Sequence, residues 1–148
     1  MKTTLEAAIF LSMNGKAKEA IEFYKTHFNA KELMLVTYLD MAKRDTSMKI
    51  TEDNKDYIAH SVLSIGKTKL MIAEDTMNTS EAYTVGNNIS LCIQSADQTE
   101  IEHFYNSLTS DNRVKVILPL SNIIFSKAYG VIEDPFGIQF QLMFDDRL

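Results

Sequence analysis

Two stretches of this chain, Gly66-Lys-Thr-Lys-Leu-Met-Ile-Ala-Glu-Asp75 and Gly137-Ile-Gln-Phe-Gln-Leu-Met-Phe-Asp-Asp146, follow the same pattern. Each begins with a glycine that suits a hairpin turn, continues as a strand and ends in acidic residues. A second correspondence lies upstream, between residues that are 80 positions apart. The matching pairs are Ile9 and Ile89, Leu11 and Leu91, Ile21 and Ile101, Tyr24 and Phe104, and Phe28 and Leu108. The sequence therefore predicts two copies of one structural unit.

Each predicted copy consists of a strand, a helix and three further strands. In the first copy, the alternation of residues predicts strands near 6–13, 32–39, 58–65 and 68–74, and helical spacing of apolar residues predicts a helix over 16–28. In the second copy, the strands are expected near 86–94, 114–119, 127–133 and 138–144, and the helix over 97–109, after a capping box of Ser95 and Gln98.

The remaining segments complete the predicted organisation. Residues 40–56 are polar and have little periodicity, which predicts a long mobile loop, a kind of segment that often serves as a lid or a dimer contact. Residues 74–85 are expected to link the two copies. The order βαβββ, repeated once, indicates an α+β fold in a single domain over residues 1–148, with modules at about 5–75 and 86–146.

Composition and charge exclude several classes of protein. The chain has 148 residues, of which 45% are hydrophobic and 24% are charged, as is typical of a globular domain. No apolar run reaches the length of a membrane span, and no signal-peptide core precedes the first acidic residue. Cys92 is alone, so no intrachain disulfide can form. The net charge of −5 and the scattered lysines argue against a nucleic-acid partner. We therefore expect a cytoplasmic protein.

Four segments, taken in order, carry a resemblance to a known family. They are Ala20-Ile21-Glu22-Phe23-Tyr24, Ala59-His60-Ser61-Val62-Leu63-Ser64-Ile65-Gly66, Leu70-Met71-Ile72-Ala73-Glu74-Asp75 and Tyr129-Gly130-Val131-Ile132-Glu133-Asp134-Pro135-Phe136-Gly137. With these segments the chain resembles, over nearly its whole length, the PhnB-like branch of the glyoxalase, bleomycin-resistance and dioxygenase superfamily (vicinal oxygen chelate, VOC). The resemblance implies that the two βαβββ modules form a curved mixed sheet around a cavity and that the protein is a homodimer.

The chain also departs from that branch. Phe125 and Phe140 stand where the branch often has tryptophan. Some members are described as ubiquinone-pathway methyltransferases, but the five glycines of this chain are scattered and form no glycine-rich strand–turn–helix signature for a nucleotide-like cofactor. We therefore expect no organic cofactor.

The resemblance also implies a metal site with two pairs of ligand positions, on the first and last strands of each module. In metal-using relatives these positions hold His and Glu, whose nitrogen and carboxylate oxygen bind divalent ions. Here they fall at Ala8, Leu70, Asn88 and Gln141. Because none of these side chains is anionic, we expect that no metal binds.

Strand alternation predicts the lining of the cavity. Apolar residues such as Ile89, Leu91 and Ile93 should pack on a helix, and their neighbours should then face the concave side. The predicted ligand-binding residues are Phe10, Ser12, His60, Val62, Asn88, Ser90, Cys92, Phe125, Tyr129, Gln139 and Gln141. This lining suits an uncharged or mixed-polarity small organic molecule, and its aromatic rings suit stacking on a flat ring. Alternatively, the aromatic residues are ordinary core and Cys92 is a small hydrophobe.

Two functional hypotheses follow. The favoured one is a PhnB-like protein of the VOC superfamily that binds a small organic molecule in a metal-free cavity. The alternative is an enzyme with lyase, isomerase or other glyoxalase-like chemistry, with or without a divalent metal, in which His60 acts as a base. Glu74 is a further candidate for moving a proton. A structural role of His60, at the cavity edge or a dimer interface, competes with the catalytic one, and His27 and His103 are expected to be partly exposed.

Overall fold

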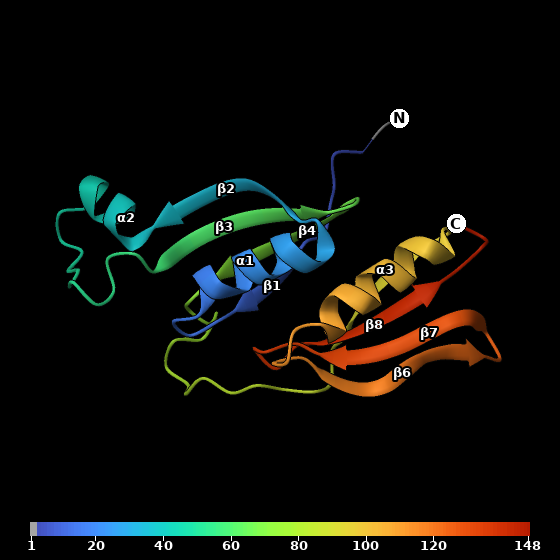
Figure 1. Ribbon diagram of the computed structural model, residues 1–148. Coiled ribbons are helices and arrows are strands. Elements are labelled where there is room, and N and C mark those ends of the chain that lie inside the picture. The colour runs from blue at the N-terminus through green and yellow to red at the C-terminus, as the bar shows by residue number, and fades with distance from the viewer. Residues whose placement is uncertain (1–2) are drawn as a thin grey trace. The chain divides into compact units, whose positions relative to one another are not determined.

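The computed structural model describes residues 3–148 (Figure 1). The chain forms two compact units, which are described separately below. Unit 1 ends at Tyr83 and unit 2 begins at Thr84, inside the predicted linker. Within the described residues, no helix is long and apolar enough to cross a membrane.

Unit 1 forms a mixed four-stranded sheet with one helix on its face. Its elements are β1 (Ile9–Ser12), α1 (Ala17–Phe28), β2 (Lys31–Thr37), α2 (Tyr38–Arg44), β3 (Ile58–Ile65) and β4 (Thr68–Ala73). The strand order is β1-β4-β3-β2, in which β1 runs parallel to β4 and the other neighbours are antiparallel. A parallel neighbour requires a crossover connection, and α1 begins that connection.

Unit 2 repeats this arrangement. Its elements are β5 (Leu91–Ser95), α3 (Gln98–Thr109), β6 (Lys115–Ile123), β7 (Ser126–Glu133) and β8 (Gln139–Phe144). The strand order β5-β8-β7-β6, with β5 parallel to β8, is that of unit 1. The predicted α+β class and the two βαβββ modules are therefore confirmed.

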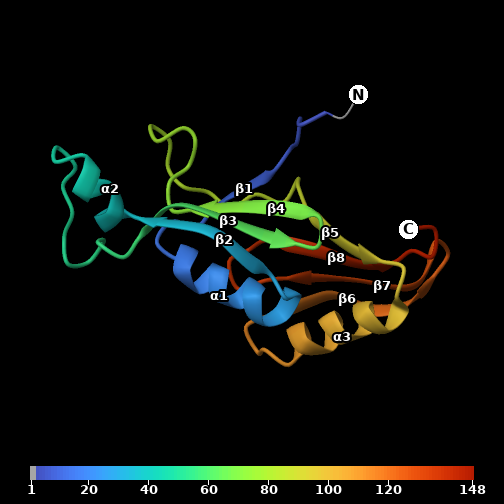
Figure 2. The same cartoon turned by 90° about the horizontal axis from the view of Figure 1, so that it is seen from above.

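In each unit one face of the sheet is covered by a helix (Figure 2). In unit 1, α1 buries residues at helical spacing, among them Ala20, Ile21 and Tyr24, and the sheet contributes the fully buried Leu70 and Ile72. In unit 2, α3 buries Ile101, Phe104 and Leu108 over the fully buried β8 residues Phe140 and Leu142. We call the opposite side of each sheet its helix-free face.

A buried carboxylate joins three segments of unit 1. Glu74, which is only 5% exposed, accepts backbone N–H groups from Gly15 (2.7 Å) and Ala17 (3.1 Å) at Oε1 and from Ile58 (2.9 Å) at Oε2. The N-cap residue Lys16 makes no side-chain cap, so Glu74 satisfies amides at the start of α1 from a distance in sequence. The Glu74 carboxylate thus links the β1–α1 turn to the start of β3 through hydrogen bonds.

The Asp-Pro-Phe-Gly segment of unit 2 is a tight turn that leads into β8. The side chain of Asp134 is 3% exposed, and its Oδ1 accepts backbone N–H groups from Phe136 (2.9 Å) and Ile138 (2.8 Å). Gly137 has φ +88, a conformation that residues with a Cβ rarely adopt. These two features explain why the motif begins with an aspartate and ends with a glycine.

Several sequence-based expectations were wrong in detail. The first strand of unit 2 begins at Leu91 rather than near 86, so Asn88 and Ile89 lie outside it and Ile89 is 75% exposed. The N-cap of α3 is Asp97, which accepts from Thr99 and Glu100, and the expected capping box is absent there. His27 is 8% exposed instead of lying at the surface, with its ring 4.5 Å from that of Phe23.

The segment predicted as a loop over 40–56 contains a helix. Its first residues belong to α2, which starts with a capping box in which Thr37 and Asp40 exchange hydrogen bonds. None of the α2 residues is buried, and the helix lies beyond the end of the sheet in both views (Figures 1 and 2). A short polar helix of this kind leaves little apolar periodicity, and its start is encoded in the capping box alone.

Candidate functional site

The helix-free face of unit 2 brings most of the predicted second-module residues together. Gln141 in β8 is paired on one side with Cys92 of β5 and on the other with Val131 of β7. Tyr129 lies two residues before Val131 in β7, opposite Met143. Because residues alternate between faces, these side chains share the side of the sheet that α3 does not cover.

A chain of hydrogen bonds runs across this face. The Tyr129 hydroxyl donates to Gln141 Oε1 at 2.6 Å, and Gln141 Nε2 donates to Ser90 Oγ at 2.9 Å. Ser90 directly precedes β5, so the hydrogen bonds join the segment before β5 to the strands β7 and β8. We call Ser90, Tyr129 and Gln141 the amide cluster. All three side chains are uncharged, and the two bonds fix the orientation of the Gln141 amide between them.

Two further residues border the amide cluster. The ring of Phe125, which is 62% exposed, meets the ring of Tyr129 edge-on with centroids 5.0 Å apart. Cys92 is an exposed residue, yet the protein around its sulfur removes enough water to raise the pKa of the thiol. Desolvation, and secondarily Cys92, also raises the pKa of Tyr129. Both groups therefore carry their protons at neutral pH.

Two other predicted residues of unit 2 take no part in the hydrogen bonds of the cluster. Gln139 is half-buried, lies two residues before Gln141 on the same face of β8, and is paired with Glu133. Asn88 is exposed and precedes the strand. The expected position of Asn88 rested on a spacing of 80 residues, which holds for the helices. The strand β5, however, follows β1 by 82 residues, because Leu11 pairs with Ile72 whereas Ile93 pairs with Leu142.

The helix-free face of unit 1 has a different character. Phe10 pairs with Met71, and Met71 pairs with Val62, which gives an apolar row across three strands. His60 lies two residues before Val62 in β3 and is paired with Val36. Within residues 3–148 the His60 side chain has no hydrogen bond. The Ser12 hydroxyl donates to the carbonyl of Asp75, two residues after β4, at 3.0 Å.

The four expected metal positions do not form a matched set. Leu70 is fully buried in the core of unit 1, Ala8 precedes β1, and Asn88 precedes β5. Only Gln141 lies in a strand on a helix-free face. The residue of β4 that corresponds to Gln141 by pairing is Met71, because Phe10–Met71 matches Cys92–Gln141. The described residues contain no group of three or more His, Cys, Asp or Glu side chains that could hold a metal ion.

Glu74 is not suited to moving a proton. Both of its oxygens accept backbone N–H groups, and the side chain is nearly inaccessible. A general base needs a lone pair that reaches the substrate, whereas three backbone N–H groups already bind the nearly inaccessible Glu74 carboxylate. The expectation that Glu74 is a pocket carboxylate is therefore wrong.

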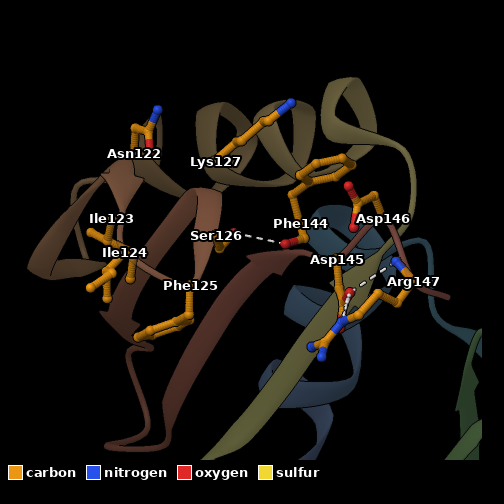
Figure 3. Close-up of a pocket in the computed structure, with 10 residues that line it drawn as sticks. All are labelled: Asn122, Ile123, Ile124, Phe125, Ser126, Lys127, Phe144, Asp145, Asp146 and Arg147. Carbon is orange, nitrogen blue, oxygen red and sulfur yellow. Dashed lines mark hydrogen bonds and ion pairs between the residues drawn. The ribbon is translucent and has the colours of Figure 1, made fainter.

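The sequence interpretation missed a hollow at the β6–β7 hairpin. Its volume is about 310 Å³, and its lining residues are Asn122, Ile123, Ile124, Phe125, Ser126, Lys127, Phe144, Asp145, Asp146 and Arg147 (Figure 3). Ser126 Oγ donates to the Phe144 carbonyl at 2.7 Å, and the Arg147 guanidinium donates to both oxygens of Asp145. Phe125 is the residue that this hollow shares with the predicted site. The sequence shows the acidic residues Asp145 and Asp146 after β8, but no local pattern indicates that they lie next to the β6–β7 hairpin.

Comparisons with known proteins cover nearly the whole chain. Residues 6–143 match the sequence model of a family described as 3-demethylubiquinone-9 3-methyltransferase. No curated protein matches the chain.

Solved structures share its fold. A putative 3-demethylubiquinone-9 3-methyltransferase, the PhnB protein from Bacillus cereus, is 21% identical with a TM-score of 0.69, over 95% of this chain and 100% of that one. A protein from Pseudomonas aeruginosa is 22% identical with a TM-score of 0.74, over 96% and 98% of the two chains. The fosfomycin resistance protein FosX from Listeria monocytogenes, complexed with Mn(II) and sulfate ion, is 12% identical with a TM-score of 0.63, over 97% and 94%.

Proposed function

Because this chain belongs to the family described as 3-demethylubiquinone-9 3-methyltransferase, the PhnB-like branch of the VOC superfamily, we propose that it binds a small, uncharged organic molecule without a metal ion. The amide cluster is the observation that carries this proposal. Polar groups that are fixed in orientation and surrounded by apolar or aromatic side chains are typical of small-molecule sites. Here Tyr129, Gln141 and Ser90 supply the polar groups and Phe125 an accessible ring.

The chemistry of the donor set supports binding without a metal. A divalent ion leaves water for anionic oxygens, thiolates or imidazoles. Gln141 and Ser90 are neutral, and no imidazole or carboxylate joins them in the amide cluster. FosX of Listeria monocytogenes has the same fold and is complexed with Mn(II), but the fold alone does not carry the metal over to this chain.

The methyl transfer named in the family description finds no support at the two strand-to-helix turns. The amides at the start of α1 are held by Glu74, and those at the start of α3 by Asp97. Both helix N-termini are thus closed by carboxylates of the chain itself, which leaves no glycine-rich cradle for a nucleotide-like cofactor. We therefore propose ligand binding rather than methyl transfer.

A thermal-shift screen against metabolites and aromatic antibiotics tests the proposal, because a ligand that binds only the folded state raises the melting temperature. Gln141→Met should abolish the shift given by a ligand, while Tyr105→Phe, a substitution on α3, should keep it. An unchanged shift in Gln141→Met would refute binding at the amide cluster. Elemental analysis of protein purified without added metal should find less than one divalent ion per chain.

The alternative of an enzyme rests on His60. This side chain lies on the helix-free face of unit 1 and has no hydrogen-bond partner in the described part of the chain, so its ring nitrogens are available to a ligand. His60→Asn separates the two functions. Loss of turnover with retained folding would favour the enzyme, whereas retained ligand affinity in a protein without turnover favours the carrier.

A further inference from the structure

The amide cluster has a defined hydrogen-bond polarity. Tyr129 donates to the Gln141 carbonyl oxygen, so the amide nitrogen faces Ser90 and donates to it. A primary amide has two N–H donors, of which one is used here. The Ser90 hydroxyl oxygen is an acceptor in this bond, so its O–H also remains available. Two donors, one N–H and one O–H, are therefore left for a ligand.

These donors determine which ligands the cluster accepts. Burying an N–H or O–H group without a hydrogen-bond partner costs more free energy than burying a carbonyl oxygen that uses only one of its lone pairs. A ligand that covers the cluster must therefore bring an acceptor oxygen. A hydrocarbon ring would displace the water that hydrogen-bonds to Gln141 and Ser90 and would offer their donors no acceptor in its place.

The charges around the cluster argue against ionic ligands. No carboxylate belongs to the cluster, so a cation finds no counter-ion there. Lys127, the cation nearest in sequence to Phe125, points away from the Phe125 ring in Figure 3. Glu133 lies four residues from Tyr129 along β7 and takes no part in the hydrogen bonds of the cluster. An anion would lose its hydration without gaining a charged partner.

An aromatic ring in the ligand is favoured by Phe125. Its side chain is 62% exposed and meets the Tyr129 ring edge-on at 5.0 Å between centroids, so a broad ring surface is presented beside Tyr129, at one end of the cluster. We propose that the ligand is an uncharged aromatic molecule that carries a carbonyl oxygen, and that Tyr129 is the positioning residue that keeps the Gln141 amide nitrogen directed to that oxygen. This inference rests on the proposed function and narrows its ligand class.

Three small probes test the class directly. Acetophenone has a ring and a carbonyl, ethylbenzene has nearly the same shape without an acceptor, and benzoate adds a negative charge. Each is titrated at equal concentrations while the side-chain amide signal of Gln141 is followed by NMR. We expect acetophenone to bind at least about 10-fold more tightly than either of the others. Ethylbenzene has no acceptor for the two donors, and benzoate must lose the hydration of its charge.

The variant Tyr129→Phe tests the positioning role, since it keeps the ring and removes the hydroxyl. The Gln141 amide then loses the bond that orients it, and acetophenone affinity should fall about 5-fold while ethylbenzene affinity stays the same. Tyr105→Phe is the matched control and should change neither affinity. A merely structural role of Tyr129 would weaken both probes alike, and that result would overturn the inference.

The other outcomes are equally decisive. Equal binding of acetophenone and ethylbenzene at Gln141 would refute the carbonyl requirement and leave the proposed binding function intact. Tighter binding of benzoate would assign the face to anions and overturn the inference. Absence of any signal change with acetophenone would also overturn it, while the proposed function itself fails only when no compound of the thermal-shift screen binds at the amide cluster.

Discussion

Removal of the Glu74 carboxylate should destabilise the protein strongly, because one side chain satisfies three backbone donors. Its oxygens lie 2.7, 3.1 and 2.9 Å from the nitrogens of Gly15, Ala17 and Ile58. A hydrogen bond to a charged group contributes about 1.5–3 kcal/mol, and a buried donor left without a partner costs about 1–3 kcal/mol. Since water reaches the Gly15 amide more readily than the other two, we expect Glu74→Ala to cost about 4 kcal/mol in total.

Chemical denaturation followed by circular dichroism measures this loss. A loss of about 4 kcal/mol corresponds to a fall of roughly 10 °C in melting temperature for a chain of this length. Glu74→Gln retains one carbonyl oxygen but turns an amide group toward an N–H donor, so it should cost about half as much. Glu81→Ala, in an exposed segment, is the control and should stay within about 0.5 kcal/mol of the parent protein. A loss below about 1 kcal/mol in Glu74→Ala would show that the three segments hold together without this carboxylate, and the reasoning would be refuted.

Three further predictions concern single residues. Burial and the charge and hydrogen bond of Asp75 raise the pKa of Tyr38 to about 12, so the late phase of a pH titration at the tyrosinate absorbance should shrink in Tyr38→Phe. Because the unfolded chain loses this proton near pH 10, the stability due to Tyr38 should be complete below pH 10 and fall up to pH 12, and Tyr38→Phe should remove that fall. The raised pKa of Cys92 should make its alkylation by iodoacetamide slower than that of a free thiol at pH 8 and still accelerating above pH 9, and a plateau below pH 8 would contradict the desolvation of its sulfur. Gly130→Ala should cost about 1–3 kcal/mol in a urea titration, because a Cβ there lies 3.1 Å from Leu120 Cα and 3.2 Å from the Leu118 oxygen.

The elements with strong periodicity were predicted well from the sequence. The third strand, Ile58–Ile65, has the predicted bounds, and both long helices lie within one residue of theirs. These segments have one buried and one accessible side, so their hydrophobic pattern determines their structure. The helix α2 was missed for the same reason, since it buries no residue and thus has no apolar stripe to detect.

His27 was expected to be partly exposed but is buried. No pattern in the neighbouring sequence indicates its burial. Its ring lies against Phe23, one helical turn earlier, on a side of α1 next to the stripe formed by Ile21, Tyr24 and Phe28. A histidine near a helix end is usually half exposed, and only tertiary contacts make this one buried. The hollow at the β6–β7 hairpin was missed for a similar reason, because its walls come from segments about 20 residues apart.

The internal repeat was recognised correctly, but its register was not, and the register determines which residues share a face. A shift by an even number of residues keeps a strand residue on its side of the sheet, and a shift by an odd number reverses it. The first strands are offset by 82 rather than 80, so their predicted faces survived. The last strands are offset by 70 rather than 71, because Met71 and Gln141 hold the same position, so Leu70 was assigned to the face opposite its real one.

The corrected register makes the two units chemically unequal at matching positions. Val62 pairs with Met71 as Val131 pairs with Gln141, so His60 in unit 1 occupies the position that Tyr129 holds in unit 2. Where unit 2 has a tyrosine bound to an amide, unit 1 has a histidine beside a thioether, and Met71 offers His60 no comparable hydrogen-bond partner. Met71→Gln, which installs the amide of unit 2 in unit 1, should therefore create a partner for His60. A change in the His60 ring signals by NMR would report it, and their constancy would show that the two positions are not equivalent.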